Sequence, residues 1–300
     1  MAERFNPIHT YSDPGLDKER FLDYELSVRI APDAFSYCIL DGLTGKFLHL
    51  ESYDLSDPGR KPIIPGEQEE WHIAKLTDLL ENTLQGFLGT PARTRILLEW
   101  GNVTLVPEAL FNEKEISTIY DFNIAGGPIP ASDLRHDFLP GMNAYSIYRI
   151  PSSVSIFFEH YFPGATIFHH STALLNGVLQ RYINLENEKQ LHVNTSRSRM
   201  DILSLKGKKL EYFNSFRFNS AEDFMYYLIY VVEKLGMNPE TVELLISGEV
   251  DKHSALLDLV VKYVRYVQFV KRNEDFRYSF VFDQLPGHYY YNLFNASLCE

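Results

Sequence analysis

VNTSRSRMDILSL, residues 193–205, has the pattern of a β-hairpin, with a strand, a polar turn and a second strand. A similar stretch, VRIAPDAFSYCIL, occupies residues 28–40 at an offset of 165 residues (193 − 28). The offset places matching residue types at four positions: Leu26 and Leu191, Val28 and Val193, Leu40 and Leu205, Gly42 and Gly207. The two stretches therefore predict an internal duplication.

The elements around the two stretches follow one order. Three strands rich in β-branched and aromatic residues are expected in each half: ELSVRI, FSYCILD and KFLHLESYDL within 25–55, then QLHVNT, RMDILSL and KLEYFNSFRF within 190–218. Apolar residues at three- and four-residue steps predict a helix after each set, over 67–88 and 220–236. A buried type of strand follows each helix, at 93–100 and 241–248. This order predicts mixed sheets with antiparallel hairpins first and parallel strands later.

The remaining segments set the expected domain limits. Residues 1–20 are polar and contain two prolines, which predicts a loosely held lead-in, and 123–143 is expected to be a loop. Further elements are expected as helices at 152–162, 171–183 and 253–271 and as strands at 143–151, 164–170 and 277–283. We expect a first lobe over 21–143 and a second over 144–300, and the lobe that the C-terminal segment joins is left open.

Composition restricts the function classes. The chain has 300 residues, is 45% hydrophobic and carries a formal net charge of −12, which opposes binding to phosphate backbones and predicts no nucleic-acid partner. The longest apolar run, residues 224–232, is too short to span a bilayer, and residues 1–15 lack the apolar core of a signal peptide. Two cysteines suggest no disulfide framework. We expect a cytoplasmic protein without a transmembrane segment.

With these elements the chain resembles the actin-like ATPase superfamily, whose members pair two ribonuclease-H-like lobes. It is similar to the bacterial actin-like proteins of pilus assembly and cell division, and more similar to an uncharacterised bacterial domain-of-unknown-function family with this fold. The resemblance covers about residues 20–300. It implies an α/β fold of two ribonuclease-H-like lobes, with mixed sheets flanked by helices.

The phosphate turns of that superfamily have the pattern Asp-x-Gly-Ser/Thr, in which glycine lets backbone N–H groups approach phosphate and aspartate holds Mg²⁺. Laid on this chain, the pattern puts Asn194 and Arg29 at the two Asp positions. Ser196 and Ala31 fall at the two Gly positions, and Pro32 removes a backbone donor from the first turn. Both acids and both glycines are replaced.

Other residues were weighed for this chemistry. Asp33 is interpreted as a turn residue and Asp201 as a solvated strand residue, although either could substitute for a lost acid. LLISGEV resembles the superfamily's adenosine-binding turn. By resemblance the nucleotide contacts would be Asn194, Ser196, Ser198, Ser247 and Gly248. No catalytic residue is assigned. No metal ligand is assigned either, since His169 and His170 are expected on opposite faces of a strand, away from His160 on a helix.

Three hypotheses remain for the function. The leading one is a degenerate actin-like protein without ATP hydrolysis and without a cofactor, acting as a scaffold or binding module for a protein partner that the sequence does not identify. The second is an ATPase or sugar-kinase-like phosphotransferase with unorthodox phosphate-turn residues. The third is a protein that binds ATP and Mg²⁺ without hydrolysis. The oligomeric state is not predicted.

Overall fold

The structure is a computed structural model that describes residues 5–56, 69–82, 84, 91–125, 128–182, 189–207 and 209–300. Contacts divide the chain into two compact units. Unit 1 comprises Met1–Ala173, Glu274–Gln284 and Leu293–Glu300, and unit 2 comprises Leu174–Asn273 and Leu285–Asn292. This division falls well after the expected lobe boundary at 143/144. Two stretches of the C-terminal segment group with unit 1 and one groups with unit 2.

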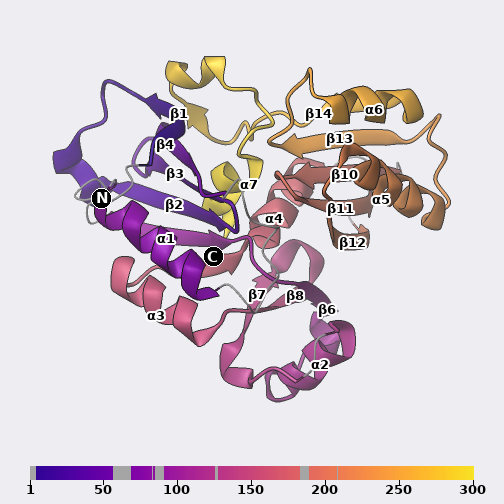
Figure 1. Cartoon of the computed structure of the whole chain (residues 1–300), viewed down its shortest axis with the longest axis horizontal. Helices are drawn as coiled ribbons and strands as arrows, with labels where there is room; N and C mark the ends of the chain where they lie inside the picture. Colours follow the sequence, from indigo (N-terminus) through magenta and orange to yellow (C-terminus); the bar gives the residue numbers. More distant parts are fainter. Residues whose placement is uncertain are drawn as a thin grey trace. The chain divides into compact units, whose positions relative to one another are not determined.

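Unit 1 is built on a seven-stranded mixed sheet (Figure 1). Its strands run in the order β1-β4-β3-β2-β5-β9, with β15 also beside β4. Their bounds are β1 Pro7–Ser12, β2 Tyr24–Ala31, β3 Ala34–Asp41, β4 Lys46–Asp54, β5 Arg93–Leu98, β9 Thr166–His169 and β15 Arg277–Tyr278. The β2-β3-β4 meander is antiparallel, whereas β2, β5 and β9 are parallel.

Two helices pack on this sheet and bury their apolar faces against it. Helices α1 (Glu69–Asn82) and α3 (Ser152–Tyr161) contact one another and share one core with the sheet. That core includes Leu79, Phe158, Val28 and Ile96. A separate small cluster joins Leu97, Phe168 and Ala173 to Ala296 and Cys299, so the end of the chain packs against β5 and β9.

A small antiparallel sheet is inserted between β5 and α3. It consists of β6 (Val103–Pro107), β8 (Ala144–Arg149) and β7 (Leu134–Leu139), with α2 (Ile116–Asn123) packed on it through Ile116 and Tyr120. The expectation of a loop over 123–143 is therefore wrong at β7. The prolines of this segment lie outside the strand, so they bound it rather than interrupt it.

Unit 2 has a five-stranded mixed sheet in the order β12-β11-β10-β13-β14. The bounds are β10 Lys189–Thr195, β11 Arg199–Lys206, β12 Lys209–Arg217, β13 Glu243–Gly248 and β14 Tyr266–Phe269. Helices α5 (Ala221–Lys234) and α6 (Ala255–Tyr263) share a core with it, while α4 (His170–Tyr182) begins in unit 1 and ends in unit 2. No helix in the described parts of the chain is long and apolar enough to cross a membrane.

The two sheets repeat one topology, with β4-β3-β2-β5-β9 matching β12-β11-β10-β13-β14. The register repeats as well: Tyr24 pairs with Asp41, and Lys189 pairs with Lys206, at the same offset of 165 (189 − 24 and 206 − 41). The α/β fold with mixed sheets flanked by helices is confirmed.

Three expected elements differ from the structure. The expected lead-in 1–20 contains β1, which pairs with β4. Its first residue is Pro7, and proline is tolerated at the start of an edge strand. The expected helix 253–271 ends at Tyr263, and the following apolar residues form β14, since a short apolar run does not distinguish strand from helix. The expected strand 277–283 is a strand only at Arg277–Tyr278 and then becomes a 3₁₀ helix.

The limits of α1 can be compared only in part. The sequence predicts a helix over 67–88, and the structure has α1 at Glu69–Asn82. Residues 67, 68, 83 and 85–88 lie outside the described residues.

Candidate functional site: two strand-end turns

Three of the predicted contacts of unit 2 meet where β10 and β13 end. These strands are parallel, and their register places Asn194 beside Ser247 and Thr195 beside Gly248. The Ser247 hydroxyl donates a hydrogen bond to Asn194 Oδ1 at 3.0 Å, and both side chains are buried. Asn194, which stands where the superfamily pattern has an aspartate, is thus hydrogen-bonded to the neighbouring strand β13.

The other two predicted contacts, Ser196 and Ser198, form the turn between β10 and β11. The Ser196 N–H donates to the Arg199 carbonyl at 2.9 Å, and the Ser198 carbonyl accepts from the Phe218 N–H at 3.0 Å. Both serines are half-buried. These backbone hydrogen bonds hold the end of the sheet together.

The backbone geometry at position 248 leaves room only for glycine. Its φ is +97°, and a Cβ built there would lie 1.9 Å from the Thr195 carbonyl oxygen. The Gly248 N–H donates to the His288 carbonyl at 2.8 Å, and the Glu249 N–H donates to the Thr195 carbonyl at 3.0 Å. A glycine at this strand end is therefore explained by close backbone approach.

His288 closes the same strand end from a distant part of the chain. Its ring stacks on Phe269 with centroids 3.9 Å apart, and its Nε2 lies 2.8 Å from the Val250 carbonyl oxygen. Burial lowers the pKa of His288. His288 could not be predicted from the sequence, because no local signal connects it with the Ser247-Gly248 turn.

Asp201 is buried and ion-paired, so its interpretation as a solvated strand residue is wrong. It is 1% exposed, and Arg199 Nε lies 3.3 Å from its carboxylate. The Ser215 hydroxyl on β12 also donates to it. The burial pattern of β11 explains the difference: residues 199–205 are all buried, so neither face of this strand is open to solvent.

The equivalent turn of unit 1 holds a buried ion pair. Arg29 donates to Glu99 Oε2 from Nε at 2.8 Å, and its Nη2 lies 2.7 Å from the same oxygen. The two side chains are 8% and 5% exposed. Glu99 follows the end of β5, which is parallel to β2, and the sequence analysis did not select it.

Ala31 and Asp33 complete the first turn. Ala31 pairs with Ala34 at the end of the β2–β3 hairpin, and the Asp33 carbonyl accepts from the Leu55 N–H at 2.9 Å. Asp33 lies in the turn, as its residue type predicts.

A second buried polar cluster of unit 1 surrounds Asp137 on β7. The Tyr148 hydroxyl donates to it at 2.7 Å, the Thr172 hydroxyl at 2.6 Å and the His169 N–H at 3.0 Å. Burial raises the pKa of Asp137 to about 6, against the opposing effect of these donors. The sequence does not predict this cluster, because the composition of residues 123–143 indicates a loop rather than β7.

The histidines considered for metal binding are arranged differently from the expectation. His169 ends β9 and His170 begins α4, so they do not alternate across one strand, and their rings lie 4.6 Å apart. His160 is exposed on α3. Within the described ranges, no group of three or more His, Cys, Asp or Glu side chains converges as metal ligands would.

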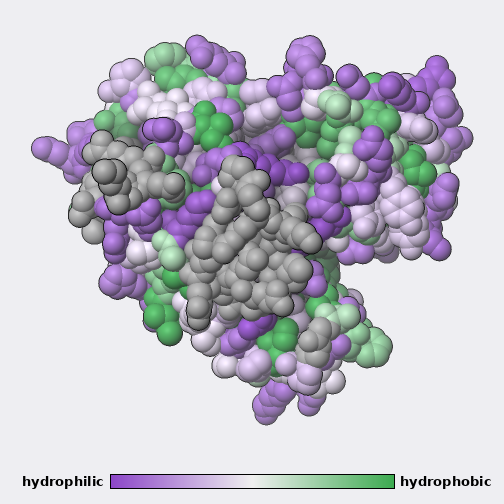
Figure 2. Space-filling view, in the orientation of Figure 1, coloured by the Kyte–Doolittle hydropathy of each residue, from purple (hydrophilic) through white to green (hydrophobic). Residues whose placement is uncertain are grey.

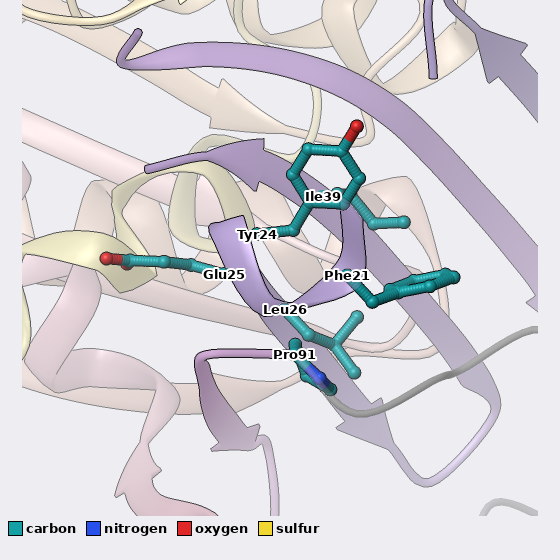
Figure 3. A pocket seen from close by; sticks show the side chains of 6 residues that line it. All are labelled: Phe21, Tyr24, Glu25, Leu26, Ile39 and Pro91. Carbon is teal, nitrogen blue, oxygen red and sulfur yellow. The ribbon is translucent and has the colours of Figure 1, made fainter. Parts of the chain in front are cut away.

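Two hollows in the described part of unit 1 lie elsewhere. Figure 3 shows a shallow one near the amino end of β2, with Glu25 pointing away from Tyr24 and Phe21. The turn that contains Ala31 is at the carboxyl end of the same strand. A second hollow, of about 420 Å³, is lined by Glu113, Ile116, Arg135 and His136 of the inserted small-sheet region, among others. Neither hollow contains a predicted nucleotide contact.

Solved structures share the fold. A Bacteroides thetaiotaomicron protein described as having an actin-like ATPase fold and unknown function is 22% identical, with a TM-score of 0.70, over 85% of this chain and 93% of that one. The protein of a PilM–PilN type IV pilus biogenesis complex is 13% identical, with a TM-score of 0.60, over 91% and 97%. A comparison with curated proteins finds no match.

These similarities establish the actin-like ATPase fold. At the sequence level, residues 13–267 match a family described as "Protein of unknown function (DUF3822)". The match covers well over half of the chain. The chain therefore belongs to the DUF3822 family and has an actin-like ATPase fold.

Proposed function

We propose that this chain is a cytoplasmic actin-like-fold protein that does not hydrolyse ATP and acts by binding a protein partner. The observation that carries the proposal is that contacts within the chain occupy both strand-end turns. Arg29 is bonded to Glu99 in unit 1, and Asn194 is bonded to Ser247 in unit 2. A fold alone does not determine function, whereas these contacts belong to the residues of the turns themselves.

The residues present do not fit Mg²⁺-nucleotide. Mg²⁺ is held by carboxylate oxygens, but the matching position of unit 1 carries the cation Arg29 and that of unit 2 the neutral Asn194. Phosphate in such turns is bound by backbone N–H groups. In unit 2 the N–H groups of Ser196, Gly248 and Glu249 already donate to carbonyls of the chain.

Two considerations support a protein partner. The PilM–PilN structure is that of a protein of this fold in a complex with another protein. That similarity concerns the fold, and protein binding is carried over here only as part of the proposal. The net charge of −12 also opposes nucleic acid as the partner.

The test combines phosphate release with thermal unfolding in millimolar Mg-ATP. We expect no phosphate release above a no-protein blank and no shift in Tm. A ligand at 100 times its Kd would stabilise the fold by about 2.7 kcal/mol, so binding at ordinary affinity would be visible.

Mg²⁺-dependent release of phosphate would overturn the proposal. Asp33→Asn and Asp201→Asn are the informative variants, because these are the acids that could replace the lost ones. Turnover that disappears in either variant, while that variant melts cooperatively, would establish an unorthodox ATPase or phosphotransferase instead. A Tm shift without turnover would establish nucleotide binding without hydrolysis.

A further inference from the structure

The outer edge of β12 is an exposed sheet edge in unit 2. In the sheet of the described residues β12 is the last strand, paired on one side with β11 (Figure 1). Lys209, Glu211, Asn214 and Arg217 along it are exposed. An edge strand presents backbone N–H and C=O groups that can pair with another chain.

The same position in unit 1 already accepts an added strand. By the repeated strand order, β4 corresponds to β12. The N-terminal segment Pro7–Ser12 lies along the outer side of β4 as β1, antiparallel, with Thr10 beside Glu51 and Tyr11 beside Leu50. This fold position is therefore compatible with one more antiparallel strand of about six residues.

Aromatic side chains flank the edge of β12 on the side of α5. Tyr226 and Tyr230 of α5 are 66% and 44% exposed, and their rings stack at 6.4 Å. Tyr227 stacks on Phe216 of β12 at 4.8 Å, which fixes this face of α5 beside the edge. On the face of the molecule shown in Figure 2, hydrophilic and apolar side chains are interspersed. Tyrosine is enriched at protein interfaces, so the exposed Tyr226 and Tyr230 suit a protein partner at this edge.

The charges at the ends of β12 are basic. Lys206 and Lys209 lie at one end and Arg217 at the other, in a chain whose net charge is −12. Glu211 lies 3.3 Å from Lys189 in an ion pair. An acidic segment would be repelled by most of this protein and attracted to this edge.

A second copy of this chain fits the edge less well. In a two-fold antiparallel pairing centred on Phe213, Lys209 of each copy would face Arg217 of the other. Like charges directly opposite one another destabilise a strand pair.

We propose that the β12 edge binds an extended, acidic segment of a protein partner, which adds as a sixth strand to the sheet of unit 2. The proposal rests on the proposed function and names the class of partner. The backbone of β12 supplies the hydrogen bonds, and Lys209 and Arg217 select the negative charge.

The test uses a fluorescein-labelled peptide of about eight alternating glutamate and valine residues, titrated at low salt in EDTA without nucleotide. Fluorescence anisotropy should show saturable binding, and a lysine–valine peptide of equal length should not bind. The same acidic peptide with alternate amide nitrogens methylated should bind at least tenfold more weakly, since methylation removes its hydrogen bonds to the edge. Equal affinity of the methylated peptide would overturn strand addition without any change to the protein.

A charge reversal locates the site. Lys209→Glu/Arg217→Glu should weaken binding at least tenfold, whereas Lys262→Glu/Arg265→Glu makes the same change of charge at exposed positions of unit 2 away from β12. Both variants should keep the wild-type circular dichroism. Equal effects of the two double variants would overturn the assignment to β12.

Two further outcomes separate the proposals. Absence of acidic-peptide binding, with a wild-type dimer that Lys209→Glu/Arg217→Glu dissociates, would make the edge an interface between copies. ATP hydrolysis would overturn the proposed function without affecting a peptide measurement made in EDTA.

Discussion

The carboxyl ends of β2 and β10 occupy the same place in two copies of one topology, yet they are stabilised by different chemistry. Glu99 N–H donates to the Ile30 carbonyl as Glu249 N–H donates to the Thr195 carbonyl, so the backbones match. The side chains at the family's acid position differ, with a buried ion pair in unit 1 and a neutral hydrogen bond in unit 2. The same strand end is thus stabilised by an ion pair in one unit and by a neutral hydrogen bond in the other.

The largest expected effect tests the close approach at Gly248. Gly248→Ala should destabilise unit 2 by about 4 kcal/mol or more, because a Cβ would overlap the Thr195 carbonyl and the φ of +97° is unfavourable. The measurement is denaturant unfolding followed by far-UV circular dichroism. Gly236→Ala is the matched control: its φ is +63°, but no atom lies within 4 Å of the added Cβ, so about 1 kcal/mol is expected. Equal losses would contradict the steric account.

The next largest effects come from breaking the Arg29–Glu99 ion pair and the Asn194–Ser247 hydrogen bond separately. Glu99→Ala should cost about 3 kcal/mol by leaving Arg29 buried without this carboxylate, whereas Ser247→Ala should cost only about 1 kcal/mol. Both tryptophans of the chain lie in the segment assigned to unit 1, so their fluorescence reports the first variant and circular dichroism reports both. The double variant Arg29→Met/Glu99→Leu sharpens the comparison. It should be more stable than Glu99→Ala, and a larger loss would show that the ion pair itself stabilises unit 1.

A smaller effect distinguishes the units by pH. His192 of β10 corresponds to Ser27 of β2 at the same offset, and both are buried. Burial lowers the pKa of His192 from 6.5 to about 3. Because the folded pKa lies below the unfolded one, the stability contribution is complete above pH 6.5 and is lost as the pH falls toward 3. At pH 5 the expected loss is about 2 kcal/mol.

The variant His192→Leu isolates that contribution. Its free energy of unfolding should change less between pH 7 and pH 5 than that of wild type, by about the same 2 kcal/mol. His49 of β4 also titrates, since burial lowers its pKa to about 4, but it is common to both proteins. An unchanged pH dependence in His192→Leu would show that His192 does not set the acid sensitivity.

The sequence predicts what depends on local pattern. The two meanders, helices α1 and α5 and strand β13 follow from alternation, helical spacing and turn residues, and the repeat follows from their order. Strand β1 could not be predicted, because a short polar segment becomes a strand only through pairing with β4. The sequence predicts a helix where β14 lies, because this short apolar run fits either period.

The site shows the same limit. The resemblance implies Asn194 and Ser247 as nucleotide contacts, and both belong to elements that the pattern predicts, but their hydrogen bond to one another is seen only in the structure. Glu99 and His288 could not be connected with the turns, because each reaches its turn through the sheet or from a distant segment. The burial of Asp201 could not be predicted for a related reason, since the local sequence does not show that both faces of β11 are covered.

The most direct test of the central claim is hydrogen–deuterium exchange with and without millimolar Mg-ATP, read in peptides covering the ends of β10 and β13. If the chain's own contacts occupy these turns, exchange of residues 194–200 and 246–250 should be slow and unchanged by the nucleotide. Added protection of these peptides by Mg-ATP would contradict the account and return the nucleotide to the unit 2 turn.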